Sequence, residues 1–284
     1  MVKLLSIEEF ETSAKNAEID ILLDARHIKE FDEQHIPGAM HIPWEEWNEP
    51  APEGASTVLH QPGYWGKLAE PVIGKVAEKL TRRGIHNDSR IVVYADGYRS
   101  KGREGRIAWM LLYFGAQNVD ILDGGFRNWQ KGGLVGVRPN PAARPFELKL
   151  DQRRQITKRE LEKQTATNAP LLIDTRGSAE FNGLEYDYQP RLGRIPAAVS
   201  FPFRQMLRAN GHFITKDEYL QIAKKLEIGA KIVWYCEVGV RAALGALLHE
   251  IYTGDVSPVY DGSFMEWSFD PALPVECAAQ QAPA

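Results

Sequence analysis

The chain reads ILLDAR at residues 21–26 and LLIDTR at residues 171–176, so a short apolar run ends twice in Asp-x-Arg. Short apolar runs of this kind are typical of strands buried in a parallel sheet, which have no solvent-facing side. The two copies lie in opposite halves of a 284-residue chain, a length that suits two domains. The repeated stretch therefore indicates an internal duplication.

Four further landmarks recur in the same order in both halves. An acidic residue followed by Phe comes first, then an Ile-Pro turn, then a β-rich run, and last an Asp-Gly turn followed by aromatic residues. For the first and second half respectively they are Glu30-Phe31 and Glu180-Phe181, residues 35–39 and 194–198, residues 90–94 and 231–235, and residues 123–129 and 261–267. This common order predicts two homologous folds.

Short apolar runs alternate with helical patterns, which favours an α/β fold with two domains, each a mainly parallel sheet flanked by helices. Thr215 and Glu218 have capping-box spacing, so a helix is expected from there to Leu226. The prolines between Gly136 and Pro145 break regular structure. We therefore place the domains at 1–137 and 148–284, joined by a linker at 138–147. We expect strands near residues 20–24, 90–95, 118–122, 170–174, 231–235 and 257–260.

Composition narrows the function classes. Hydrophobic residues make up 44% of the chain and charged residues 25%, as in ordinary soluble proteins. A net charge of −4 and a pI near 6.0 give no overall attraction to nucleic acid or to an anionic membrane. No apolar run reaches the roughly 18 residues of a membrane span, and the start of the chain turns acidic before any run of signal-peptide length. We expect a cytoplasmic enzyme with neither nucleic acid nor membrane as a partner.

Cys236 directly follows the predicted strand at 231–235, and a helix of small apolar residues begins soon after it. At a strand–loop–helix junction, inward-pointing N–H groups and the positive helix end favour a thiolate over a thiol. Gly239 permits the positive φ that a tight loop requires. A buried structural cysteine is the alternative, but this setting favours a nucleophile. The other cysteine, Cys277, lies in an Ala- and Gln-rich tail and is regarded as incidental.

The first half has no nucleophile at the equivalent position. Tyr94 aligns with Tyr235, so Ala95 takes the place of the cysteine and Asp96 follows it. We expect this half to be a non-catalytic partner that helps to enclose the site. The loop up to Gly105 is longer than its counterpart, and it is either a docking surface or a solvated loop. Its basic residues are Arg99, Lys101 and Arg103.

These motifs resemble the tandem-domain rhodaneses, the thiosulfate and 3-mercaptopyruvate sulfurtransferases. The resemblance covers nearly the whole chain and rests on residues 23–26, 35–39, 123–129 and 173–176 and on the Cys236 loop. It implies two rhodanese-like domains, of which the second is catalytic. In that chemistry Cys236 takes a sulfane sulfur from a small donor anion, most simply thiosulfate, and carries it as a persulfide. A thiophile then removes the sulfur, either cyanide or a cellular thiol such as thioredoxin or glutathione, with no metal or organic cofactor.

The loop after the cysteine is the expected persulfide cradle, an anion site of the oxyanion-hole kind. Many family members have basic or small residues directly after the cysteine, and this chain departs from that pattern. Glu180 also stands where animal members carry a substrate-binding arginine, which weighs mainly against 3-mercaptopyruvate as the donor. The cradle residues are Glu237, Val238, Gly239, Val240 and Arg241.

Three arginines remain as candidates to bind the sulfonate or carboxylate of a donor, with surface or ion-paired roles as the alternative. They are Arg191, Arg194, which replaces the usual histidine of the His-Ile-Pro-Gly motif, and Arg241. Asp174 and Arg176 either orient the loop or form a plain structural ion pair. The seven histidines lack ligand spacing with the two cysteines, so no metal site is expected.

Three other functions stay open. The chain could be a 3-mercaptopyruvate sulfurtransferase, or a persulfide carrier in a sulfur relay that does not turn over by itself. A cysteine phosphatase or arsenate reductase is less favoured, because those related enzymes place an arginine six positions after the cysteine. Here Arg241 is five positions after Cys236, and position six is Ala242.

Overall fold

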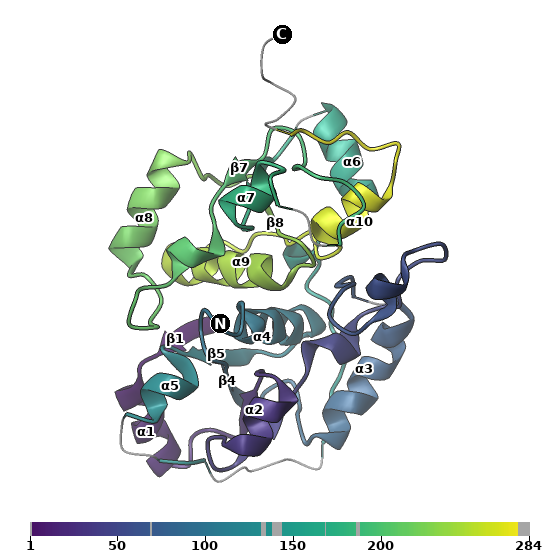
Figure 1. Ribbon diagram of the computed structural model, residues 1–284. Helices are drawn as coiled ribbons and strands as arrows, with labels where there is room; N and C mark the ends of the chain where they lie inside the picture. The colour runs from purple at the N-terminus through teal and green to yellow at the C-terminus, as the bar shows by residue number, and fades with distance from the viewer. Residues whose placement is uncertain are drawn as a thin grey trace.

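Two parallel sheets carry the fold, one in each half of the chain (Figure 1). The computed structural model describes residues 2–68, 70–131, 135–137, 144–167, 169–185 and 188–277. Within them the strand order is β1-β5-β4-β2-β3 in the first sheet and β7-β6-β8 in the second. Every strand pairing is parallel, and the predicted α/β class is confirmed. The strands are β1 Val2–Leu5, β2 Ile21–Asp24, β3 Ala39–His41, β4 Arg90–Tyr94, β5 Asn118–Leu122, β6 Leu171–Asp174, β7 Val199–Ser200 and β8 Ile232–Tyr235.

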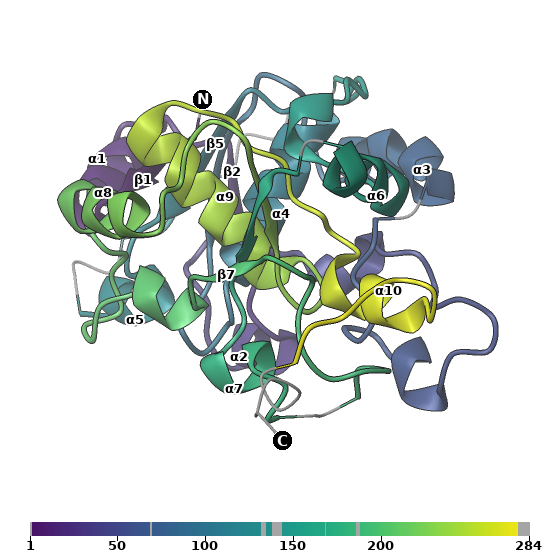
Figure 2. The ribbon, with the colours of Figure 1, turned by 90° about the horizontal axis from the view of Figure 1, so that it is seen from above.

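Helices surround both sheets, and α4 and α9 face each other across the boundary between the halves (Figures 1 and 2). In the described residues, the first half contains α1 Ile7–Lys15, α2 Ile28–Glu33, η1 Trp44–Trp47, η2 Thr57–His60, α3 Glu70–Arg82, α4 Arg103–Phe114 and α5 Gly125–Trp129. The second half contains η3 Gln152–Arg154, α6 Lys158–Thr167, α7 Ser178–Phe181, η4 Phe203–Met206, α8 Lys216–Lys225, α9 Val240–Thr253 and α10 Ser263–Phe269.

Most of the predicted elements are present. Five of the six expected strands lie within a residue of their predicted bounds, as β2, β4, β5, β6 and β8. The sixth, at 257–260, is wrong: Val259 makes only isolated bridges, because the neighbouring Pro258 has no N–H to donate to a ladder. The predicted helix is α8, and Thr215 and Glu218 form its capping box. Of the predicted linker, residues 138–143 lie outside the described residues.

The same buried ion pair recurs in both halves. The carboxylate of Asp24 accepts a hydrogen bond from Arg26 at 2.6 Å, and Asp174 accepts one from Arg176 at 2.7 Å. Each guanidinium also lies over the Phe ring that follows the Asp-Gly turn, 3.8 Å and 4.1 Å from its centroid. Because the half with Ala95 in place of the cysteine keeps the whole arrangement, the structural alternative for Asp174 and Arg176 is favoured.

The two halves also exchange equivalent contacts. The carboxylate of Asp261 accepts a hydrogen bond from the backbone N–H of Leu68 at 2.7 Å, across the boundary. The equivalent Asp123 accepts one from the backbone N–H of Phe213 at 2.8 Å. Each Asp-Gly turn therefore caps a backbone segment of the opposite half, and the two halves are related by an approximate twofold arrangement.

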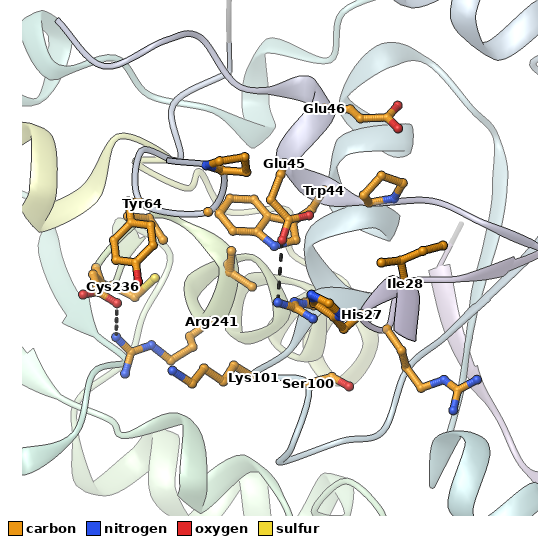
Figure 3. Close-up of a pocket in the computed structure, with 18 of the residues that line it drawn as sticks. His27, Ile28, Trp44, Glu45, Glu46, Tyr64, Ser100, Lys101, Cys236 and Arg241 are labelled. Atoms are coloured by element: carbon orange, nitrogen blue, oxygen red, sulfur yellow. Dashed lines mark hydrogen bonds and ion pairs between the residues drawn. The ribbon is translucent and has the colours of Figure 1, made fainter. Parts of the chain in front are cut away.

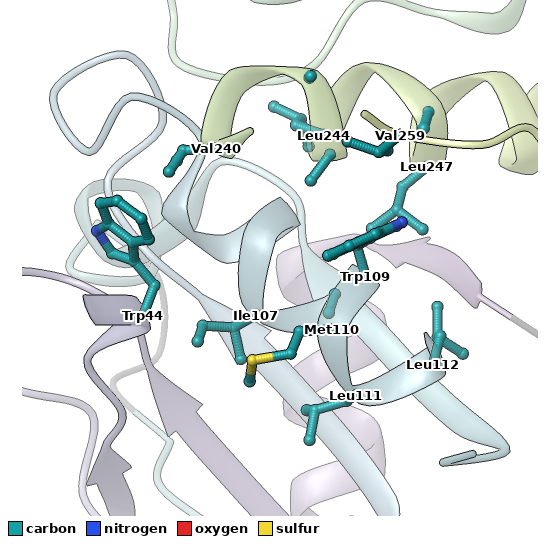
Figure 4. Close-up of a cluster of buried hydrophobic side chains, with 14 of the residues drawn as sticks. Trp44, Ile107, Trp109, Met110, Leu111, Leu112, Val240, Leu244, Leu247 and Val259 are labelled. Atoms are coloured by element: carbon teal, nitrogen blue, oxygen red, sulfur yellow. The ribbon is translucent and has the colours of Figure 1, made fainter. Parts of the chain in front are cut away.

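The hydrophobic core continues from one half into the other. Buried residues of α4, such as Trp109, belong to the same cluster as residues of α9, such as Leu244 and Leu247 (Figure 4). The helices approach closely at Gly105, where a Cβ atom would lie 2.5 Å from the Cβ of Leu244. Glycine is therefore required at this crossing, and the shared core holds the sheets, and the loops at their ends, at a fixed distance.

Candidate active site

Cys236 is the first residue after β8 and is completely buried. The four-residue connection to α9 ends at Gly239, which caps the helix with φ at +80°. The backbone N–H of Gly239 points at the sulfur, with a distance of 3.1 Å from N to Sγ. A Cβ atom on Gly239 would lie 2.5 Å from the carbonyl oxygen of Asp261. Backbone conformation and crowding both select glycine here, and they aim one N–H donor at the sulfur.

Ser263 holds the backbone of the cysteine, a role that the sequence analysis missed. Its hydroxyl accepts a hydrogen bond from the N–H of Cys236 at 3.1 Å and donates one to the carbonyl of Tyr260 at 2.8 Å. The Phe264 N–H also donates to the Cys236 carbonyl at 3.0 Å. A signal was present in the sequence, because the turn reads DGSF in this half and DGGF in the other.

A cavity of about 790 Å³ lies between the halves and ends at Cys236 (Figure 3). One wall is the loop after β8. The opposite wall comes from the first half: η1, residues 62–64 and the loop before α4. Since the cysteine is buried, a small molecule reaches its sulfur from this cavity. The expectation that the first half helps to enclose the site agrees with this geometry.

Arg241 lines the cavity, but its guanidinium is already bound to carboxylates. It donates to Glu180 at 2.8 and 2.9 Å and to Glu237 at 3.4 Å. Burial disfavours the charged form of Glu180, yet the hydrogen bonds and charge of Arg241 hold the pKa of that carboxyl below its usual value. The charge of Arg241 is therefore balanced inside the site. The carboxylates that balance it, Glu180 and Glu237, stand at two positions where the sequence departs from the motif pattern described above.

Arg191 and Arg194 do not line the cavity. The guanidinium of Arg191 donates to four backbone carbonyls between Trp267 and Leu273, and so fixes the segment after α10. Arg194 pairs with Glu276 at 3.2 Å and lies over the Phe181 ring. Both positions match the ion-paired or structural alternative, and neither arginine is among the residues that line the cavity.

The basic loop before α4 contributes Ser100 and Lys101 to the cavity wall, and the first residue of α4 contributes Arg103. Arg103 lies 3.6 Å from Glu45, so a carboxylate balances its charge. Lys101 has no carboxylate partner among the residues that the structure describes, and it points toward the end of the cavity that holds Arg241 and Cys236 (Figure 3). The free positive charge of this cavity therefore comes from the half that lacks the cysteine.

Arg106 and Gly66 bring the first half against the cysteine loop. The Arg106 guanidinium is buried, donates to the carbonyl of Gly66, and leaves Nε and Nη1 without a partner in the described part of the chain. Burial lowers the pKa of this guanidinium, while the nearby Asp261 and Cys236 oppose that effect. A Cβ atom on Gly66 would lie 1.8 Å from the Val238 carbonyl oxygen. The sequence signal was an arginine placed directly before the apolar run at 107–112 in α4.

Cys277 lies away from the cavity, with its sulfur 3.6 Å from the carbonyl oxygen of Asn182. In the described ranges, no group of three or more His, Cys, Asp or Glu side chains is placed to hold a metal ion. No helix in the part of the chain described here is both long enough and apolar enough to cross a membrane.

Comparison with known proteins identifies the family. The rhodanese-like domain matches twice, at residues 6–132 and 157–270, so this chain belongs to the rhodanese-like family. Thiosulfate sulfurtransferase of Gallus gallus is 32% identical over 86% of this chain and 81% of its own length. 3-Mercaptopyruvate sulfurtransferase of Homo sapiens is 31% identical over 86% and 80%. A probable 3-mercaptopyruvate sulfurtransferase of Pseudomonas aeruginosa is 29% identical over 93% and 95%.

These relatives confirm the predicted family, and with it the class of enzyme, a sulfurtransferase. Solved structures support the fold alone. An anaerobic ergothioneine biosynthesis enzyme from Chlorobium limicola has a TM-score of 0.79 at 20% identity, over 97% of this chain and 70% of the other.

Proposed function

We propose that this sulfurtransferase uses thiosulfate as its donor and Cys236 as the sulfur carrier. The single observation that carries the proposal is the buried cysteine at the end of the cavity, with the Gly239 N–H directed at its sulfur. The Cys236 thiolate attacks the outer sulfur of thiosulfate. The S–S bond of the donor breaks, sulfite leaves with the bonding electron pair, and a persulfide anion remains on the cysteine. The Gly239 N–H is placed to donate to the sulfur as the charge moves.

The acceptor step regenerates the cysteine. A nucleophile such as cyanide, or the thiolate of glutathione or thioredoxin, attacks the outer sulfur of the persulfide and leaves as thiocyanate or a new persulfide. The Cys236 thiolate is the leaving group, so no external oxidant or reductant is consumed. Because Cys236 is fully buried, a protein acceptor has to bring its thiol into the cavity on a narrow segment.

Lys101 is the proposed anchor for the sulfonate group of the donor. Arg241 and Arg103 are each balanced by carboxylates, whereas Lys101 lines the same cavity with no such partner in the described residues. A cation from the non-catalytic half thus supplies the charge that the loop residues Glu237 and Val238 do not. 3-Mercaptopyruvate is the competing donor, because the similar proteins of Homo sapiens and Pseudomonas aeruginosa are named as sulfurtransferases for it.

The deciding experiment measures kcat/KM for thiosulfate and for 3-mercaptopyruvate side by side, together with the mass of the intact protein after each donor. We expect thiosulfate to give the higher kcat/KM, and one added sulfur of roughly 32 Da that cyanide removes. The added sulfur should be lost in Cys236→Ser and kept in Cys277→Ser. A higher value for 3-mercaptopyruvate would replace the donor, and a persulfide that forms without steady-state turnover would indicate a carrier.

A further inference from the structure

The duplicated fold forms the active-site cleft twice. In the catalytic cavity, the loop after β8 faces η1 and residues 62–64 of the other half, and Asp261 caps the Leu68 N–H that follows. A second cavity, of about 470 Å³, lies where the loop after β4 faces η4 and residues 207–211. There Asp123 caps the Phe213 N–H in the same way. The second cavity is therefore the counterpart of the proposed active site, around the loop that has Ala95 at the position of the cysteine.

The charge of this second cavity is strongly one-sided. Asp96 is the carboxylate among its lining residues, and it is shared by Arg127 at 3.1 Å and Arg99 at 3.9 Å. Its cationic lining residues come from both halves of the chain: Arg99, Arg127, Lys131, Arg204 and Arg208. Arg208 is paired outside the cavity with Glu218 at 2.9 Å. Apart from Arg208, four cationic residues therefore line the cavity against one carboxylate.

Two of these cations have no carboxylate partner in the described part of the chain. Among the described residues, Lys131 donates to the side-chain oxygen of Asn128, at 3.2 Å. The guanidinium of Arg204 lies over the Tyr98 ring, 4.5 Å from its centroid, which leaves its N–H groups free for another acceptor. Arg204 belongs to the second half, and Tyr98 and Lys131 belong to the first. Unpaired donors thus converge on this cavity from both sides of the boundary.

We propose that this second cleft binds a small, multiply charged oxyanion of the phosphate or sulfate class. Guanidinium groups match the oxygens of such an anion in geometry as well as in charge. The cavity volume falls within the range of roughly 300–1,000 Å³ that small-molecule sites occupy. Because Ala95 stands in the place of the cysteine, the ligand is bound without sulfur transfer. This proposal does not depend on the identity of the sulfur donor.

A bound anion would connect the two halves. It would touch Arg204 on one side and Lys131 on the other, and so favour the folded, docked arrangement by the usual linkage between binding and stability. Pyrophosphate is a suitable probe, because it carries two phosphate groups and can contact both sides at once. Sulfate is the second probe, because the site could instead bind an anion of the sulfate class.

The test is calorimetric titration of the full chain with pyrophosphate and, separately, with sulfate, at fixed low ionic strength. The decisive variant is Lys131→Gln/Arg204→Gln, which removes no described ion pair. The control is Arg82→Gln/Arg153→Gln, which removes the same charge at exposed positions outside both cavities. We expect one saturable site whose Kd rises at least tenfold in the decisive variant and stays within twofold in the control. The probe with the lower Kd shows whether the site prefers an anion of the phosphate class or of the sulfate class.

Three outcomes would overturn the proposal. The first is an absence of saturable binding of either probe. The second is equal weakening in the decisive and control variants, which would reduce the effect to overall charge. The third is binding that survives in the decisive variant but is lost in Lys101→Ala, which would place the anion in the catalytic cavity. Lys131→Gln alone, at an exposed position, provides the same comparison if the double variant folds poorly.

Discussion

The loop after β4 and the loop after β8 leave equivalent strands and lead into equivalent helices, yet these helices begin with different side chains at matching positions. Each helix begins after a glycine in the left-handed conformation, Gly102 in one half and Gly239 in the other. Two positions further on, the first half has Glu104 and the second has Arg241. The ion pair, the Asp-Gly turn and the cross-boundary cap are kept in both. The frame of the fold is therefore independent of the chemistry that its loops carry.

The comparison also shows that residues of both halves line the cavity of the proposed active site. The longer loop of the first half has no nucleophile, but it places Lys101 in the cavity of the second half. Gly66, from the same half, lies against the cysteine loop. The first half thus forms part of the cavity that ends at Cys236, and substitutions in either half should alter sulfur transfer.

The largest effect is expected from moving the cysteine between the loops. In Cys236→Ala/Ala95→Cys, sulfur transfer should fall by about 10⁴-fold or more, because the nucleophile is lost and the new position is followed by the Asp96 carboxylate. Thiocyanate formation from thiosulfate and cyanide measures this. Cys277→Ser is the control that should retain full activity. A persulfide on the introduced cysteine that turns over would show the loops to be interchangeable.

The next largest effect concerns the contact between the halves. In Gly66→Ala the new Cβ atom would meet the Val238 carbonyl and displace the cysteine loop. Displacements of about 1 Å at a reacting group cost on the order of 10²-fold, and we expect a loss of that size in kcat/KM. Gly229→Ala is the control, since Gly229 is outside the left-handed region and a Cβ atom there meets only the Glu227 carbonyl oxygen, at 4.0 Å. An unchanged kcat/KM in Gly66→Ala would show that this contact from the first half does not support the site.

A smaller effect is expected at Lys101. If Lys101 binds the donor, Lys101→Ala should raise the KM for thiosulfate by about tenfold and leave kcat nearly unchanged, because it removes binding that the ground and transition states share. The difference should shrink as salt is added. Lys29→Ala, at an exposed lysine of α2 outside the cavity, should change neither constant. A loss confined to kcat would assign Lys101 to the chemical step instead.

The smallest effect is a change in the pH dependence of stability at Glu104. Burial raises the pKa of this carboxyl to about 8 from a usual value of 4.5. The folded protein therefore holds a proton that the unfolded chain releases, and stability falls as pH rises from about 5 to 8. Glu104→Gln should remove up to about 1.4 kcal/mol of this loss per pH unit. Unfolding by urea at several pH values measures it, with exposed Glu53→Gln as the control. If the free energy of unfolding depended on pH in the same way in the variant and the wild type, the raised pKa of Glu104 would be contradicted.

Local patterns were enough to predict the frame of the fold. The strands β2 and β6 end in Asp-x-Arg, and the junction after β8 places Cys236 at the carboxyl end of a strand. Each feature depends on residues close together in the chain. The short β1 was missed because four residues, one of them Lys3, carry too little periodicity. Likewise β7 has only two residues.

The rest of the site depends on contacts between distant residues. The sequence left Arg241 open as a donor anchor or an ion-paired residue, because its carboxylate partner Glu180 lies far back in the chain. Ser263 is far from Cys236 in sequence, and Gly66 comes from the other half. No spacing rule within one segment reports such pairs. The order of the repeated landmarks predicted that two halves exist, but not which of their faces meet.

The shared core between α4 and α9 also has a consequence for biosynthesis. Nearly all of α4 is buried, partly against residues such as Leu244 that lie far later in the chain. The first half leaves the ribosome before α9 has been made, so the apolar face of α4 stays uncovered during that interval. A nascent chain of this kind needs protection from aggregation until its second half arrives. Expression of the first half alone should accordingly yield insoluble protein.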